Sequence, residues 1–158
     1  MRTETINVYS FDELSDEAKD KARSKYRENC DFHWSDECKD SINAFCDHFG
    51  IRLTAWSVSP YSSPDYSAEY FNSHFRGLKL KDFKRDHMPT GYCLDCDLWM
   101  TFYDEFKATG CAKKAFDKAL WAGFIGWRNE MESQLEDDYI DEHLMINEYE
   151  FTEDGDTH

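Results

Sequence analysis

The residues with the most direct chemical potential are two thiols three positions apart, in the run Cys93-Leu-Asp-Cys96. Zinc takes four Cys or His ligands in a tetrahedron, and His87 and Cys111 flank this pair along the chain. A second pair at the ordinary spacing is missing from the sequence, so a zinc-binding module is only a further alternative. We interpret both thiols as first-turn residues of a helix and expect no metal and no cofactor.

Three more cysteines recur every eight residues, at Cys30, Cys38 and Cys46, with His33 and His48 close by. Eight residues are near two turns of an α-helix, so Cys38 and Cys46 are expected on one helix face. There they would pack as small apolar side chains, with a metal role as the alternative.

No set of residues in the sequence supports catalysis. A Ser/His/Asp or Cys/His set with a recognisable motif, a glycine-rich phosphate loop and an HExxH motif are all missing. His143 stands beside Asp141 and Glu142, where we interpret it as a solvated histidine at an acidic helix end rather than a general base. The protein is therefore predicted not to be an enzyme.

The favoured candidate site is a group of carboxylates in the C-terminal third of the chain. The proposed partner-binding residues are Glu130, Glu132, Glu136, Asp137, Asp138, Asp141 and Glu142. Carboxylates three or four residues apart on a helix lie roughly 5–6 Å from one another, so such a row can imitate a run of phosphates. No Lys or Arg follows Arg128 to relieve their repulsion. An ordinary solvated face is the alternative interpretation.

The chain carries 33 Asp and Glu against 18 Lys and Arg, a formal charge of −15. Such a field repels duplex nucleic acid and attracts a basic protein surface, including one that normally holds nucleic acid. One locally basic stretch contains Arg76, Lys79, Lys81, Lys84 and Arg85. We interpret its bases as balancing acids of the same domain, with contact to nucleic acid or to an acidic partner as the alternative. Direct nucleic-acid binding is not expected.

A chain of 158 residues that is 41% hydrophobic can bury one core of its own. We predict a single compact domain over residues 1–152 and a polar tail over residues 153–158. The polar start of the chain does not look like a signal peptide, and no apolar run is long enough to span a membrane. An intracellular location is expected, in which the six cysteines would stay reduced.

Hydrophobic periodicity and capping residues outline the fold. The longest signal is Cys111–Leu144, whose apolar residues follow one another at steps of three or four and predict one continuous helix. Gly123 and Gly126 lie on a small-residue face of this helix, where another backbone can approach closely. Helices are predicted over 16–28, 35–49, 94–108 and 111–144, and strands over 6–10, 51–59, 66–71 and 146–152. They predict an α+β fold, a small antiparallel sheet covered by about four helices, with a long central C-terminal helix.

Both ends of the chain carry distinctive runs, Ile6-Asn-Val-Tyr-Ser-Phe-Asp-Glu-Leu-Ser-Asp-Glu-Ala-Lys-Asp-Lys-Ala and Asn147-Glu-Tyr-Glu-Phe-Thr-Glu-Asp-Gly. These runs resemble the opening and the ending of a family of small phage and prophage proteins, some labelled "antitoxin of toxin–antitoxin stability system". The predicted helix in Trp34–Ile51 resembles the family more loosely, and Leu53–Thr109 does not match it. The family offers no catalytic residues to transfer. The resemblance implies a phage-borne accessory protein in the cytoplasm of the host cell, where countering a host defence is a common task.

Taken together, these observations favour a phage-encoded, non-catalytic inhibitor of a host nucleic-acid-handling defence system, of the anti-CRISPR or anti-restriction type. It would bind the basic surface of a host defence protein or nucleoprotein complex through its acidic face, as a nucleic-acid mimic. The alternative is an antitoxin-like protein that binds and neutralises a toxin through an apolar groove. An exposed patch of Trp or Tyr side chains would favour that alternative.

Overall fold

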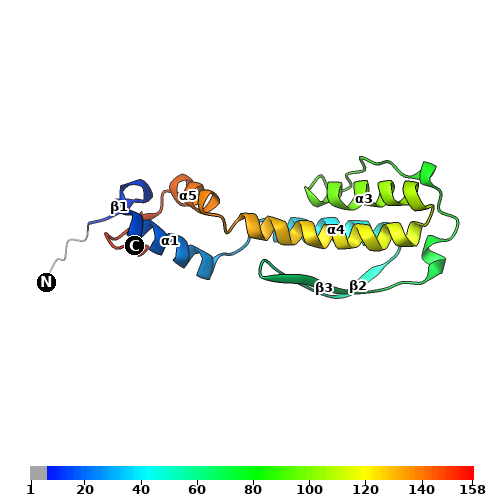
Figure 1. Cartoon of the computed structure of the whole chain (residues 1–158), viewed down its shortest axis with the longest axis horizontal. Coiled ribbons are helices and arrows are strands. Elements are labelled where there is room, and N and C mark those ends of the chain that lie inside the picture. The colour runs from blue at the N-terminus through cyan, green and yellow to red at the C-terminus, as the bar shows by residue number, and fades with distance from the viewer. Residues whose placement is uncertain (1–6) are drawn as a thin grey trace. The chain divides into compact units, whose positions relative to one another are not determined.

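The computed structural model of the protein describes residues 7–158, drawn in colour in Figure 1. The fold class is α+β, as predicted. The chain divides into two compact units: unit 1 combines both ends, Met1–Phe32 and Ser133–His158, and unit 2 is the stretch between them, His33–Glu132. Whether the two units act as a single domain over residues 1–152 stays a prediction.

Unit 1 consists of a short strand pair and two helices. Its elements in chain order are β1 (Tyr9–Ser10), the 3-10 helix η1 (Phe11–Glu13), α1 (Asp16–Asn29), α5 (Asp137–Ile146) and β4 (Glu150–Phe151). β1 and β4 pair in antiparallel fashion, with Tyr9 opposite Phe151. The strand predicted from Ile6 is therefore seen only from Tyr9, and Ile6 itself lies outside the described residues.

α1 begins where its sequence predicts. The Oγ of Ser15 accepts a hydrogen bond from the backbone N–H of Ala18 at 3.2 Å, and Asp16 and Glu17 occupy the first turn, where the helix dipole favours negative charge. Apolar residues of both ends of the chain form the core of unit 1, namely Phe11, Leu14, Ala18, Ala22, Ile140, Leu144 and Phe151.

Unit 2 contains three long helices and a β-hairpin. Its elements are α2 (Ser35–His48), β2 (Arg52–Ser59), β3 (Ser62–Glu69), the 3-10 helices η2 (Asn72–Phe75) and η3 (Leu80–Asp82), α3 (Leu94–Thr109) and α4 (Ala112–Ser133). The helices α2 and α3 and the strand β2 therefore appear close to their predicted bounds. No helix within residues 7–158 combines the length and apolar character needed to cross a membrane.

Aromatic rings fill the centre of unit 2. Phe45 of α2 stacks on Phe116 of α4 with 5.3 Å between ring centroids and meets Trp99 of α3 edge-on at 5.0 Å. Such ring pairs contribute about 0.5–1.5 kcal/mol each beyond the area they bury. The small-residue face of α4 receives a side chain rather than the predicted backbone: an added Cβ at Gly123 would lie 2.5 Å from the side chain of Leu98. α3 therefore packs directly on the backbone of α4.

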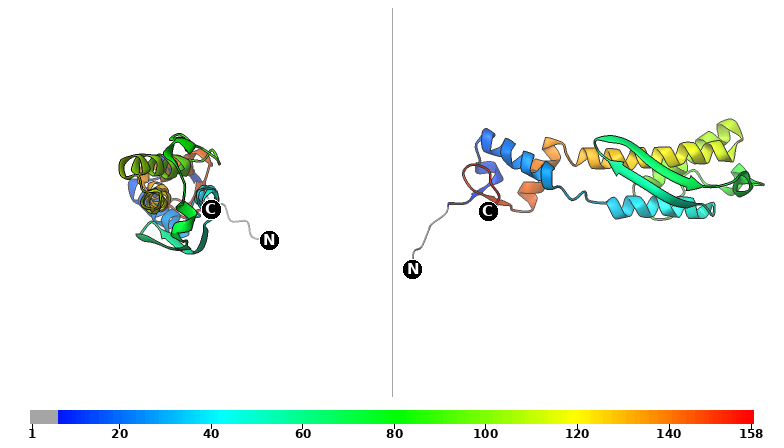
Figure 2. Two further views of the ribbon diagram at one scale, coloured as in Figure 1. Left: turned by 90° about the vertical axis from the view of Figure 1, so that its right-hand side faces the viewer. Right: turned by 90° about the horizontal axis from the view of Figure 1, so that it is seen from below.

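The β2–β3 hairpin lies along α4, as the right-hand view of Figure 2 shows. Tyr66 of β3 stacks on Phe124 of α4 with 4.4 Å between centroids. The return strand begins at Ser62, earlier than the predicted Tyr66, because the turn takes only Pro60 and Tyr61.

The prediction of one small sheet is wrong. β1 pairs only with β4 and β2 only with β3, so the described residues contain two separate two-stranded sheets. The physical reason is the division of the chain. The two terminal strands belong to unit 1, whereas the hairpin belongs to unit 2 and packs on its helices, so each strand pair forms its own sheet.

The predicted continuous helix over Cys111–Leu144 is also wrong, because α4 ends at Ser133 and α5 begins at Asp137. Between the two helices, the carbonyl of Leu135 accepts a hydrogen bond from Nε of Arg27 at 3.0 Å. The break places Asp137 and Asp138 in the first turn of a new helix, where the helix dipole stabilises negative charge. In the interior of one continuous helix, the same carboxylates would repel their neighbours without this compensation. The tertiary contact and the local charges thus favour a break in the helix although the apolar spacing continues through it.

Candidate functional site

The seven carboxylates predicted to bind a partner fall into different units. Glu130 and Glu132 lie on α4 in unit 2. The others cap or form α5 in unit 1, namely Glu136, Asp137, Asp138, Asp141 and Glu142. The acidic row assumed from the sequence is therefore interrupted, and Glu132 lies 3.2 Å from Nε of Arg128, one turn earlier on α4. Whether these residues bind a partner stays a prediction.

Two of the predicted residues are held by arginines of α1. Nε and Nη2 of Arg23 donate to the two carboxylate oxygens of Asp141, at 2.7 and 2.6 Å. One turn along each helix, Arg27 pairs with Asp137. Because α1 and α5 run in opposite directions, equal spacing of four residues on both helices brings both pairs into register. We call these two pairs the Arg–Asp ladder.

The last residues of the chain fold back onto the same helix. Nζ of Lys21 lies 2.8 Å from a carboxylate oxygen of Asp154 and 2.8 Å from one of Asp156, and Lys25 also pairs with Asp156. The hydrogen bond from Lys21 is the main cause that lowers the pKa of Asp154 to about 2. Residues 153–158 are polar, as predicted, but they are folded against α1 rather than free.

Six other carboxylates of the C-terminal segment are exposed and lie outside these contacts. They are Glu136, Asp138, Glu142, Glu148, Glu150 and Glu153, and none of them is ion-paired to a Lys or Arg of the part of the chain that the structure describes. We call them the acidic face of unit 1. Residues 1–32 and 133–158 together hold 18 acids against 6 bases, so unit 1 carries −12 of the chain's −15.

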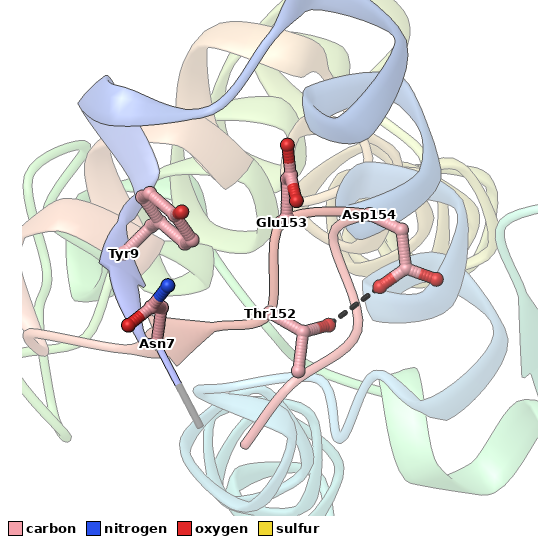
Figure 3. Close-up of a pocket in the computed structure, with 5 residues that line it drawn as sticks. All are labelled: Asn7, Tyr9, Thr152, Glu153 and Asp154. Atoms are coloured by element: carbon pink, nitrogen blue, oxygen red, sulfur yellow. Dashed lines mark hydrogen bonds between the residues drawn. The ribbon is translucent and has the colours of Figure 1, made fainter. Parts of the chain in front are cut away.

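An open pocket beside β1 belongs to the same acidic unit. It has a volume of about 440 Å³ and is lined by Asn7, Tyr9, Thr152, Glu153 and Asp154. Figure 3 shows the hydroxyl of Thr152 donating to Asp154, at 2.6 Å. Every lining side chain carries an oxygen that can accept a hydrogen bond, and two of them are carboxylates. Asp154 is already paired with Lys21, so Glu153 is the carboxylate of this pocket left to meet a cationic group.

The cysteines do not assemble a metal centre in the described residues. Cys96 lies in the first turn of α3, as predicted, whereas Cys93 is the N-cap just before the helix. Both thiols are exposed, although one was expected to be partly buried. No cluster of three or more potential metal ligands occurs within residues 7–158. Cys38 and Cys46 are buried in α2, as predicted, and burial raises the pKa of each thiol to about 12. These two thiols pack as apolar side chains.

The ion-pair partners of the C-terminal acids are cations of α1, which the sequence pattern did not predict. They come neither from residues after Arg128 nor from the basic stretch, and they lie more than 100 positions away along the chain. A usable signal was nevertheless present. Arg23 and Arg27 are spaced like Asp137 and Asp141, so two helices of opposite charge could be matched turn by turn.

The two end runs from which a phage-protein family was predicted, Ile6–Ala22 and Asn147–Gly155, both belong to unit 1. They contain β1 and β4, which are hydrogen-bonded to each other. No protein-family model matches this chain, and comparison with curated proteins and with solved structures gives no match either.

Proposed function

We propose that this chain is a non-catalytic, phage-encoded inhibitor that docks its acidic unit 1 on the basic, nucleic-acid-binding surface of a host defence complex. The observation that carries the proposal is the concentration of charge: unit 1 holds −12, and six of its carboxylates are exposed and unpaired in residues 7–158. The phage setting and the choice of a defence complex, such as a CRISPR effector or a restriction enzyme, come from the resemblance of the two end runs.

The ion pairs within unit 1 change which carboxylates the proposal uses. Asp137 and Asp141 are taken by the Arg–Asp ladder and serve to position α5. Glu136, Asp138 and Glu142 remain exposed on the same helix. Asp138 and Glu142 are one turn apart, so their carboxylates neighbour each other on the helix surface and offer paired negative charges to a row of Lys or Arg.

The position of the ladder also supports a rigid anionic surface. A surface held in one geometry loses less entropy on binding than a mobile chain end with the same charges. α5 is fixed to α1 by the bidentate pair of Arg23 and Asp141, whose side chains are only 17% and 25% exposed. The acidic face is thus carried by a supported helix.

The proposal is tested with two variants of equal net charge. The test variant combines Glu136→Gln, Asp138→Asn and Glu142→Gln on the acidic face. The control variant combines Asp40→Asn, Asp65→Asn and Asp86→Asn, three exposed carboxylates of unit 2. Each variant is expressed in cells that carry a CRISPR or restriction system, and plasmid or phage survival is measured. The purified chains then compete with a labelled duplex for the purified effector.

We expect the wild type and the control to protect the plasmid and displace the duplex, with displacement falling steeply as salt rises. The test variant should lose most of this effect because its three lost charges belong to the docking surface. Equal behaviour of the two variants, or displacement that does not respond to salt, would contradict the proposal.

An antitoxin-like function is the second candidate, and a specific observation favours it. Trp56 of β2 and Trp121 of α4 are 42% and 44% exposed. They flank Tyr66, which lies opposite Trp56 in the hairpin and 6.4 Å from the ring of Trp121. This aromatic line is a suitable contact for an apolar groove of a toxin. Rescue of growth from a co-expressed toxin should then fail with Trp121→Ala and survive in the acidic-face test variant.

A further inference from the structure

One end of unit 2 is basic although the chain as a whole is acidic. The segment that contains η2 and η3 and the turn between α3 and α4 lie together at this end, on the right of Figure 1. Six of its cations are exposed and have no ion pair within residues 7–158, namely Arg76, Lys79, Lys81, Lys84, Lys107 and Lys114. We call these six residues the basic end.

Two phenylalanine rings, one buried and one partly buried, hold the segments of the basic end against the helices. Phe75 of η2 lies 5.4 Å from the ring of Phe116 on α4, and Phe83, just after η3, lies 4.9 Å from Phe102 on α3. The cations that stand between and beside these anchors are therefore attached to the core of the unit rather than to a loose loop.

The local charge of this end is positive. Residues 72–86 and 104–118 together hold nine Lys and Arg against five acids, a net of +4. Three of the nine form ion pairs across or along the helices, for example Arg85 with Asp104 at 2.8 Å. The prediction that the basic stretch balances acids of its own domain is therefore confirmed for Arg85. The other four cations of the stretch form no ion pair within residues 7–158 and can meet an anion of another molecule.

An exposed aromatic ring begins the segment that carries most of these cations. Phe71 is 73% exposed, and its ring lies nearly parallel to that of His74, at 6.2 Å and 17°. The neighbouring Tyr70 is anchored on α4, because its hydroxyl donates to Asp117 and Lys113 lies over its ring at 5.3 Å. Phe71 is thus a large exposed apolar ring at the start of the segment that carries Arg76 and Lys79.

We propose that the basic end binds single-stranded nucleic acid, with the cations on successive phosphates and a base stacked on Phe71. Positive charge alone would also suit a duplex or an acidic protein. The exposed ring decides for a single strand, whose unpaired bases can stack on an aromatic side chain while its phosphates follow the cations. This function is independent of the proposed docking of unit 1, and it differs from the expectation drawn from the net charge of the whole chain.

The test uses the full chain and a fluorescent 20-nucleotide thymidine strand, with fluorescence anisotropy at 50 and 200 mM NaCl. For a single strand, the logarithm of affinity falls with the logarithm of salt concentration with a slope of about −0.7 per phosphate contact. If four cations contact phosphates, affinity should therefore fall about 50-fold between the two concentrations. Lys81→Glu removes one such contact. The affinity of this variant should therefore fall only about 20-fold between the two salt concentrations, and it should be weaker than that of the wild type at both. Lys39→Glu makes the same charge change on α2, where Lys39 lies over the ring of Trp56 at 5.4 Å, and should leave binding unchanged.

A second matched pair tests the ring. Phe71→Ala should weaken binding about fivefold or more, the lower range for loss of one stacked base. Tyr61→Ala removes a ring of similar exposure, 76%, from the hairpin turn and should have no effect. The proposal is overturned if the strand does not bind at 50 mM NaCl, or if either test variant behaves like its control. Tighter binding of a 20-base-pair duplex, or equal competition by polyglutamate, would likewise overturn it in favour of a duplex or an acidic protein partner.

Discussion

The substitution Asp141→Asn should loosen unit 1 by separating α5 from α1. Asp141 accepts two hydrogen bonds from Arg23, at 2.7 and 2.6 Å. An asparagine of the same shape keeps one oxygen but turns an amide nitrogen toward the other guanidinium N–H, so a donor faces a donor. The charge that attracts Arg23 is lost as well.

The magnitude follows from the exposure of the pair. An exposed ion pair contributes about 0–1 kcal/mol, and breaking a fully buried one costs about 3–5 kcal/mol. With side chains 17% and 25% exposed, this pair lies between the two cases. We therefore expect a loss of about 2 kcal/mol, in the range of hydrogen bonds to charged groups. That loss corresponds to an opening equilibrium about 30-fold larger.

Hydrogen exchange measured by mass spectrometry can localise this effect, with tryptophan fluorescence as a second probe. All five tryptophans, Trp34, Trp56, Trp99, Trp121 and Trp127, lie within residues 33–132, so their fluorescence reports on unit 2 alone. Peptides of α1 and α5 should exchange about 30-fold faster in Asp141→Asn while the fluorescence stays unchanged.

Glu142→Gln is the matched control, because Glu142 is the next residue on α5 and is exposed. A surface change of this kind usually stays within about 0.5 kcal/mol. If Asp141→Asn accelerates exchange in α1 and α5 no more than Glu142→Gln does, the Arg–Asp ladder does not hold the unit together and the reasoning fails.

Three further outcomes are expected. Gly155→Ala should destabilise unit 1 by about 2 kcal/mol or more in thermal unfolding, because φ is 83° there and the new Cβ would collide with the carbonyl oxygen of Ala18. Asp154 has a folded pKa of about 2, below its ordinary 3.8, so its ion pair stabilises fully above about pH 4 and is lost toward pH 2. Melting temperatures of wild type and Asp154→Asn should accordingly differ at pH 6 and converge near pH 2. With a thiol reagent at pH 8, the exposed Cys96 should react at once, and the buried Cys46, whose pKa is about 12, only after unfolding.

Local signals in the sequence were sufficient for most of the helices. Ser15 followed by two acids marks the start of α1, and Gly110, in the left-handed region at φ 66°, ends α3. The apolar stripe of α4 is buried as its spacing predicts, through Phe116, Leu120, Phe124 and Trp127. These features depend on neighbours within a few residues, which a sequence displays directly.

The break after Ser133 and the arrangement of the strands depend on distant contacts. Residues 134–136 contain neither Gly nor Pro, and the hydrogen bond from Arg27 to Leu135 joins positions 108 residues apart. Likewise, β1 could pair with β4 or extend a sheet with the hairpin, and its two residues carry no pattern that distinguishes these choices. Periodicity gives the type of an element, whereas its partners follow from packing that only the folded chain displays.

Ion pairing in unit 1 and the proposed partner binding would use different carboxylates, so the two should respond differently to salt. The contacts of Asp141 with Arg23 are partly buried and bidentate, so dissolved ions screen them weakly. The acidic face is exposed, and its attraction to a partner is screened strongly once the Debye length falls to about 3 Å near 1 M salt. Raising the salt should therefore release a bound partner while α1 and α5 stay together. An acidic surface that unfolded as its charges were screened would instead lose binding and structure at the same salt concentration.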